Sequence, residues 1–163
     1  IEEMEPVIRS SHFVSFDIAG IRRSDAPAGS VSPNGFSGEE ACSLASFAGQ
    51  SELAETFGIY GYRPERDING ATALQIAQMI WYYIDGRSKR KNESALEDSH
   101  NFNQFHTSIT SDEVTIFLQS KRTGRWWMQL PDNKYIACSR HDYLSASNHE
   151  IPERWLRAQE REF

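Results

Sequence analysis

The 163-residue chain is about one domain long, and its 39% hydrophobic and 25% charged content is ordinary for a soluble globular protein. The formal net charge of −6 argues against non-specific binding to nucleic acid. No membrane contact is expected either, because the longest apolar run, near residues 76–84, falls short of the roughly 20 residues that span a bilayer. Cys42 and Cys138 have no disulfide or metal-binding spacing. A core position for Cys42 and a reducing, cytoplasmic location are the simplest expectations.

The first half of the chain predicts alternating strands and helices. The expected order is a strand at 12–18, a loop at 20–35, a helix at 37–49, a strand at 56–62 and a helix at 72–85. Capping boxes, at Ser37 with Glu40 and at Thr72 with Gln75, predict where the two helices begin. Strand, helix, strand and helix at this spacing indicate a parallel sheet with right-handed crossovers.

Two of these elements lack a polar face. The strand at 12–18 has almost no polar alternation, which predicts that both of its faces are covered. The helix at 72–85 is apolar nearly all round, so we expect it to pack between the sheet and another element or subunit.

The second half has a different pattern. Residues 87–105 are polar, begin with a basic run at 87–91, and predict a solvated linker or loop. Residues 106–163 predict an α+β extension with a three-stranded antiparallel meander and two short helices, which begin near Ser139 and Pro152. Ser139, His141 and Asp142 are too close in sequence to favour a catalytic triad, since triads are assembled from distant positions.

The candidate site lies where the first strand ends. Asp17 is placed at the carboxyl end of this strand, which is the edge where open α/β sheets bind ligands. The segment from Phe13 to Pro27 resembles the last metal-binding motif of the arginase–agmatinase–formimidoylglutamase family, the ureohydrolases, which reads Ser-x-Asp-x-Asp-x-x-Asp-Pro. Residues 33–36, 59–64 and 69–85 are similar to the segments that follow this motif in the family.

The resemblance implies a fold and an activity. Residues 1–86 would be the C-terminal strand–helix units of a three-layer α/β/α arginase-like domain, followed by a linker at 87–105 and the extension at 106–163. The extension resembles that of a formimidoylglutamase-like branch. The family hydrolyses carbon–nitrogen bonds of linear amidines and guanidines, with two Mn²⁺ ions that activate a shared hydroxide. Expected partners are a missing N-terminal half or other subunits of the same protein, in a homo-oligomer.

The sequence departs from the family at its functional positions. Ala19 replaces the second aspartate of the motif, Gly61 stands where the substrate-binding glutamate is expected, and the Asp-Pro positions hold Arg22 and Arg23. Asp17 is therefore the single metal-ligand candidate, in an incomplete site, and we assign no catalytic residue. A role in capping a loop or pairing with Arg22 or Arg23 is favoured for Asp17 over metal binding, and a turn role is favoured for Asp25.

Two interpretations of the function follow. In the first, the chain is the C-terminal portion of a ureohydrolase-like protein that acts on a formimidoylglutamate-like substrate and is inactive alone. The start at Ile1 rather than at Met favours a piece of a longer protein. In the second, the chain is a non-catalytic arginase-fold relative that serves as an assembly or binding module. In either case an open sheet edge beside Val14 predicts association of the isolated chain.

Overall fold

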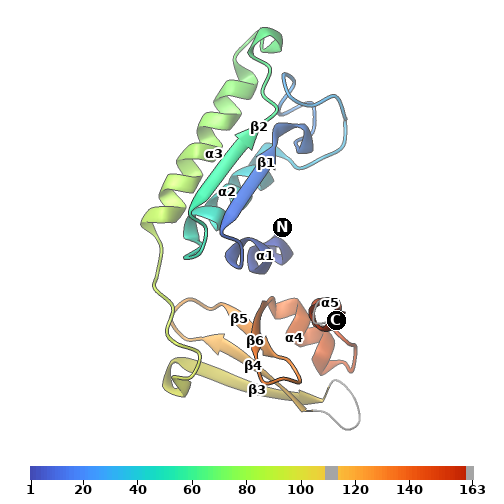
Figure 1. Cartoon of the computed structure of the whole chain (residues 1–163). Helices are drawn as coiled ribbons and strands as arrows, with labels where there is room; N and C mark the ends of the chain where they lie inside the picture. Colours follow the sequence, from blue (N-terminus) through green and yellow to red (C-terminus); the bar gives the residue numbers. More distant parts are fainter. Residues whose placement is uncertain (109–113, 161–163) are drawn as a thin grey trace. The chain divides into compact units, whose positions relative to one another are not determined.

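The computed structural model describes residues 1–108 and 114–160 of the chain (Figure 1). The chain divides into two compact units, one made of residues 3–90 and one that begins at Lys91. No helix in the described ranges combines the length and the apolar character needed to cross a membrane. The structure is mixed α/β, with a parallel sheet in the first unit and an antiparallel sheet in the second.

The first unit contains two parallel strands and three α-helices. Its elements are α1 (Glu5–Arg9), β1 (Phe13–Asp17), α2 (Gly38–Gln50), β2 (Thr56–Tyr60) and α3 (Ala71–Ser88), with short 3-10 helices at Glu2–Met4, Ile18–Gly20 and Pro64–Arg66. Figure 1 shows β1 and β2 side by side and pointing the same way, in a register that pairs Phe13 with Thr56 and Asp17 with Tyr60. The predicted strand–helix–strand–helix order is confirmed.

Helix α2 begins as the sequence predicts. The Glu40 amide donates to Ser37 Oγ at 3.1 Å, and the Ser37 amide donates to the Glu40 carboxylate at 2.8 Å. This capping box satisfies two amides that have no partner inside the helix.

Helix α3 begins differently, and the capping box predicted at Thr72 is wrong. The Asp67 carboxylate, upstream of the helix, accepts from the amides of Thr72 and Ala73 at 3.3 and 2.9 Å. Thr72 lies inside the first turn, fully buried, and its hydroxyl accepts from the Ala28 amide at 3.0 Å. The Thr72 side chain therefore anchors a distant loop instead of capping its own helix.

The core of this unit is built by close packing of α2 on α3. Gly49 and Gly86 mark the contact: a Cβ at Gly49 would lie 2.2 Å from the Tyr83 carbonyl oxygen, and one at Gly86 would lie 2.4 Å from the Ser46 carbonyl oxygen. Glycine at both positions lets the two backbones approach. The residues buried in this core are Ile8, Phe16, Ile18, Ile21, Ala26, Ala41, Cys42, Leu44, Ala45, Ala48 and Met79.

Only one face of the two-stranded sheet is packed against this core. Val14, Phe16, Phe57 and Ile59 contribute to the core, whereas Phe13 and Tyr60, on the other face, are each 53% exposed. The expectation that both faces of the first strand are covered is therefore not met within residues 3–90. A three-layer arrangement stays a prediction.

The second unit is a four-stranded antiparallel sheet with two helices against it (Figure 1). It contains β3 (Phe102–Ser108), β4 (Val114–Ser120), β5 (Trp126–Gln129), β6 (Tyr135–Cys138), α4 (Arg140–Ser147) and α5 (Glu153–Glu160), in the strand order β3-β4-β5-β6, after a 3-10 turn at Ser99–Asn101. The buried residues of its core are Phe117, Trp126, Met128, Leu130, Cys138, Ala146 and Trp155.

The sheet has one strand more than the three-stranded meander predicted from the sequence. The additional strand, β3, begins inside the segment assigned to the polar linker. It is an edge strand in which Asn103, Gln104 and His106 are exposed, so its composition is that of a loop. Its apolar contribution comes from Phe102, whose ring packs edge-on to Trp127 with centroids 5.7 Å apart, and from Phe105, whose ring stacks on Trp126 with centroids 5.1 Å apart.

Candidate functional site

Asp17 is the last residue of β1, and its side chain turns back onto the following backbone. One carboxylate oxygen accepts from the Ala19 amide at 2.9 Å and thereby caps the 3-10 helix Ile18–Gly20. Ala19 therefore lies in a helical turn rather than two residues along the strand. The strand geometry that would align side chains 17 and 19 on one face ends at Asp17.

The structure brings two of the substituted family positions, Ala19 and Gly61, next to Asp17. Gly61 follows β2, and a Cβ built on it would lie 2.4 Å from the Asp17 carboxylate oxygen. Its φ of +81° is a left-handed conformation that side-chain-bearing residues rarely adopt. A glutamate at position 61 would thus require both a backbone change and a displacement of Asp17.

The loop between β1 and α2 packs over this edge of the sheet. The Arg63 amide donates to the Ala28 carbonyl at 3.2 Å, and Ala28 is 1% exposed. A Cβ at Gly29 would lie 2.2 Å from the Ile18 side chain, so the loop is in close contact with the residue that follows Asp17. The carboxyl edge is therefore partly filled by the chain itself.

Asp25 holds this loop to the start of α2. Its carboxylate accepts from Arg22 Nε at 2.9 Å, from the Gly38 amide at 2.7 Å and from Ser24 Oγ at 2.7 Å. The Arg22 hydrogen bond, followed by those from Gly38 and Ser24, lowers the pKa of Asp25 to about 2. Arg22 thus pairs with Asp25 and not with Asp17, and Asp25 has the turn role that the sequence favoured.

The residues at this edge do not fit a pair of Mn²⁺ ions. Asp17 supplies one carboxylate, whereas the second aspartate position of the motif holds the methyl group of Ala19. Across the described ranges, 1–108 and 114–160, no three His, Cys, Asp or Glu residues gather as a metal-binding group. Buried Cys42 is not a ligand candidate, because burial raises the pKa of its thiol and keeps it protonated.

In the second unit, Ser139 and Asp142 form a helix cap rather than a catalytic arrangement. The Ser139 amide and hydroxyl donate to one Asp142 oxygen at 2.8 and 3.0 Å, and Arg154 Nε donates to the same oxygen at 3.0 Å. Asp142 is 6% exposed, so the carboxylate is fully engaged in holding α4 against α5. The sequence offered no signal for the Arg154 contact, which spans 12 residues.

Two charged residues in the predicted linker have structural roles that sequence reasoning missed. Arg90, within the basic run, donates to the carbonyls of Gly49 and Ala54, each at 2.8 Å, and so closes the end of α2. Glu93 accepts from the Ser120 hydroxyl at 2.8 Å and from the Thr123 hydroxyl at the β4–β5 turn. Neither contact has a local pattern that could have revealed it.

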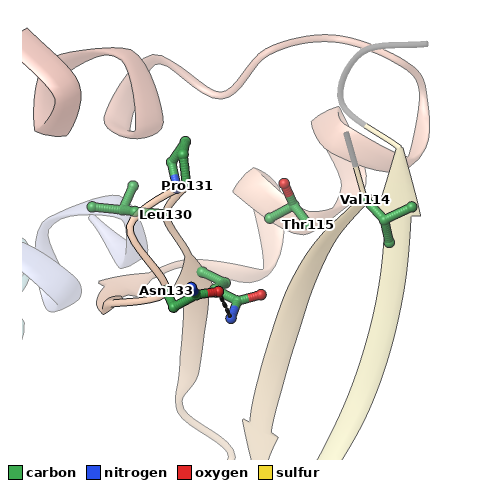
Figure 2. Close-up of a pocket in the computed structure, with 6 residues that line it drawn as sticks. Val114, Thr115, Leu130, Pro131 and Asn133 are labelled. Carbon is green, nitrogen blue, oxygen red and sulfur yellow. Dashed lines mark hydrogen bonds between the residues drawn. The ribbon is translucent and has the colours of Figure 1, made fainter. Parts of the chain in front are cut away.

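A pocket of about 200 Å³ lies at one end of the antiparallel sheet (Figure 2). It is lined by Val114, Thr115, Gln129, Leu130, Pro131 and Asn133. Figure 2 shows the one hydrogen bond drawn between these residues, from Gln129 Nε2 to Asn133 Oδ1 at 3.3 Å. Among the described residues that line it, none is acidic, basic or a thiol, so these side chains offer no group for general acid–base catalysis.

Comparison with known proteins finds partial likeness to solved structures. Two crystal structures of Trypanosoma cruzi formiminoglutamase with Mn²⁺, one of them of the oxidized protein at pH 8.5, are each 22% identical to this chain with a TM-score of 0.46. The likeness covers 48% of this chain and 27% of the formiminoglutamase chains, so only about a quarter of their length is represented. No protein-family model and no curated protein matches.

Proposed function

We propose that this chain is a ureohydrolase-like polypeptide that does not hydrolyse amidines by itself and acts as an assembly or binding module. The observation that carries the proposal is the contact between Asp17 and Gly61. The lone carboxylate is engaged in capping its own backbone, and the residue beside it has a conformation that side-chain-bearing residues rarely adopt.

Loss of hydrolysis follows from what the chemistry needs. A hydroxide shared by two divalent ions requires several oxygen or nitrogen ligands around the pair. Ala19 offers none, and the loop at Ala28 and Gly29 packs against the same edge. Binding a cationic amidine would also require a carboxylate, and Gly61 provides only backbone.

The binding role is supported by the apolar surface of the first unit. Phe13 and Tyr60 lie on the uncovered face of the parallel sheet, each 53% exposed. Leu74, Trp81 and Ile84 on α3 are 65%, 60% and 60% exposed. These are two separate exposed apolar surfaces, one on the open sheet face and one on α3, and exposed apolar patches of this kind mark surfaces that bind other polypeptides.

Metal content and turnover of the 163-residue chain test the catalytic half of the proposal. The chain is loaded with Mn²⁺, dialysed and analysed for bound metal, beside Asp17→Asn as the matched control. We expect no stoichiometric Mn²⁺ in either protein and no release of glutamate from formimidoylglutamate. Two Mn²⁺ per wild-type chain, lost in Asp17→Asn, would overturn the proposal.

A second candidate is that Asp17 contributes one ligand to a metal site completed by another polypeptide. The observation in its favour is that Asp17 is exposed at the carboxyl edge of the sheet, where ligands of α/β proteins are held. This candidate predicts that Asp17→Asn lowers the Mn²⁺ content of the assembled protein, whereas the module role predicts no change.

A further inference from the structure

Helix α3 has two opposite apolar faces, and the first unit uses one of them. Thr72, Met79 and Gly86 are buried at intervals of seven residues on the side that packs against α2. The other side is solvent-exposed, although no charged residue occurs from Ala71 to Ile84. An exposed helix face without charge over almost four turns is unusual for a surface that meets only water.

The exposed residues have the spacing of a helix–helix contact. Leu74, Ala77, Trp81 and Ile84 follow one another at intervals of three, four and three residues, and all four are exposed. This is the spacing of the seam along which two helices pack with knobs in holes. We call these four residues the α3 seam.

The seam is complementary to itself when two copies run antiparallel. If a two-fold axis crosses the helix at the level of Met79, position 74 of one copy lies opposite position 84 of the other, because each is five residues from the axis. Position 77 likewise lies opposite position 81. Leu74 then meets Ile84, and the large Trp81 ring lies over the small Ala77 of the other copy. Alternation of large and small residues lets facing helices interdigitate.

The available area suits a reversible dimer. With the exposed fractions of Leu74, Trp81 and Ile84 and that of Ile80 beside them (46%), the face presents roughly 450 Å² of apolar surface per copy. Two copies would bury on the order of 1,000 Å², near the lower limit for specific interfaces. Each chain has a formal net charge of −6, but none of the charged residues belongs to the α3 seam. The contact therefore brings no like charges directly against each other.

We propose that a second copy of this chain docks antiparallel on α3, with the α3 seam of each copy as the contact. This inference deepens the proposed assembly role and rests on it. The dimer pairs Leu74 with Ile84 and Ala77 with Trp81, in both directions across the two-fold axis.

The first experiment measures molar mass by sedimentation or by light scattering, with the full chain at about 1 to 100 µM. The wild type is expected to shift from monomer to dimer over this range. Ile84→Glu places a charge in the seam and should weaken dimerisation at least tenfold. Ile68→Glu is the matched control, because Ile68 is 94% exposed and lies outside α3, and it should dimerise like the wild type. Far-UV circular dichroism shows whether each variant is folded.

The second experiment tests the register. A chain with both Leu74→Cys and Ile84→Cys should form a covalent dimer with a short thiol-to-thiol reagent, whereas Leu74→Cys with Ile68→Cys should not. The native thiols do not compete, because Cys42 and Cys138 are 4% and 1% exposed.

Three results would overturn the proposal: a monomer at every concentration, a dimer that Ile84→Glu leaves intact, or equal cross-linking of the two cysteine pairs. Metal content and turnover are separate readouts. A chain that dimerises through the seam and also hydrolyses formimidoylglutamate would refute the module role while leaving the docking surface in place.

Discussion

The two units differ in how much of their sheet's edges and faces their own residues pair or cover. The antiparallel sheet pairs each strand with its neighbour along the chain, and α4 and α5 cover one face of it. Phe117 and Met128 are fully buried there. The parallel sheet has two strands, and within residues 3–90 it offers two outer edges and one uncovered face.

The difference follows from the connections that each kind of sheet needs. Antiparallel strands can be joined by short turns, so a small unit can add strands locally. Each parallel strand requires a crossover, and such sheets normally have both faces covered. In the first unit the α2–α3 contact therefore supplies most of the core. Most of the large apolar side chains that stay exposed in the described residues also belong to this unit. The first unit therefore leaves more of its apolar surface uncovered than the second does.

The largest expected effect tests whether one unit can unfold while the other stays folded. Phe117→Ala removes a fully buried ring from the second core and should cost about 3–5 kcal/mol, enough to unfold that unit. Hydrogen exchange followed by mass spectrometry should show loss of protection in β3 to β6 but not in α2 and α3. Val114→Ala, on the same strand at 63% exposure, is the control and should change little. Loss of protection in both units would show that they unfold as one.

The next effect probes the helix contact on which the first unit depends. Alanine at an ordinary helix glycine stabilises by about 1 kcal/mol. At Gly86 a Cβ would lie 2.4 Å from a backbone carbonyl of α2 that cannot move aside, so Gly86→Ala should destabilise by about 1–3 kcal/mol instead. Urea denaturation measures the sign. The control, Gln78→Ala, alters an exposed position of the same helix and should leave the first unit as stable as wild type or slightly more so.

The sequence predicted those elements of the fold that have local signals. The Ser37–Glu40 capping box placed the start of α2, and strand–helix alternation indicated the parallel pair. The start of α3 was predicted to within one residue, but its cap was assigned to Thr72 because the residue that does cap it, Asp67, lies four residues before the helix. The strand β3 was missed because it lies at the sheet edge with polar side chains exposed, and such composition also describes a loop.

At the candidate site, sequence reasoning singled out Asp17 and Gly61 but could not place their backbones. Asp17 and Gly61 were selected by their positions in a family motif, and the structure places Gly61 beside the Asp17 carboxylate. The left-handed conformation of Gly61 and the turn at Ala19 depend on packing of the 20–37 loop, which no short pattern encodes. Long-range contacts such as that of Arg90 with Gly49 are beyond local patterns for the same reason.

A smaller effect tests that site. Gly61→Ala should destabilise the first unit by roughly 1–2 kcal/mol from the left-handed backbone alone, and further through contact with Asp17. Asp17→Ala removes the contacted carboxylate, so Gly61→Ala should cost less in that background. Urea denaturation of the four proteins of this double-mutant cycle gives the coupling energy. Additive effects would show that the two residues do not press on each other in solution.

The smallest effect is a pH dependence confined to the first unit. Hydrogen bonds from Arg22, Gly38 and Ser24 lower the pKa of Asp25 from its ordinary value of 3.8 to about 2 in the folded chain. Because the folded pKa is the lower one, this stabilisation is complete above about pH 4 and is lost as the pH falls towards 2. Asp25→Asn should therefore lower the urea midpoint of the first unit at pH 7, and the difference from wild type should vanish near pH 2. The loss should be small, since Arg22 is solvent-exposed and such pairs contribute little. Asp98→Asn, in the second unit, is the control and should leave the acid response of the first unit unchanged. A wild-type acid response in Asp25→Asn would show that the loop is held to α2 by its other contacts.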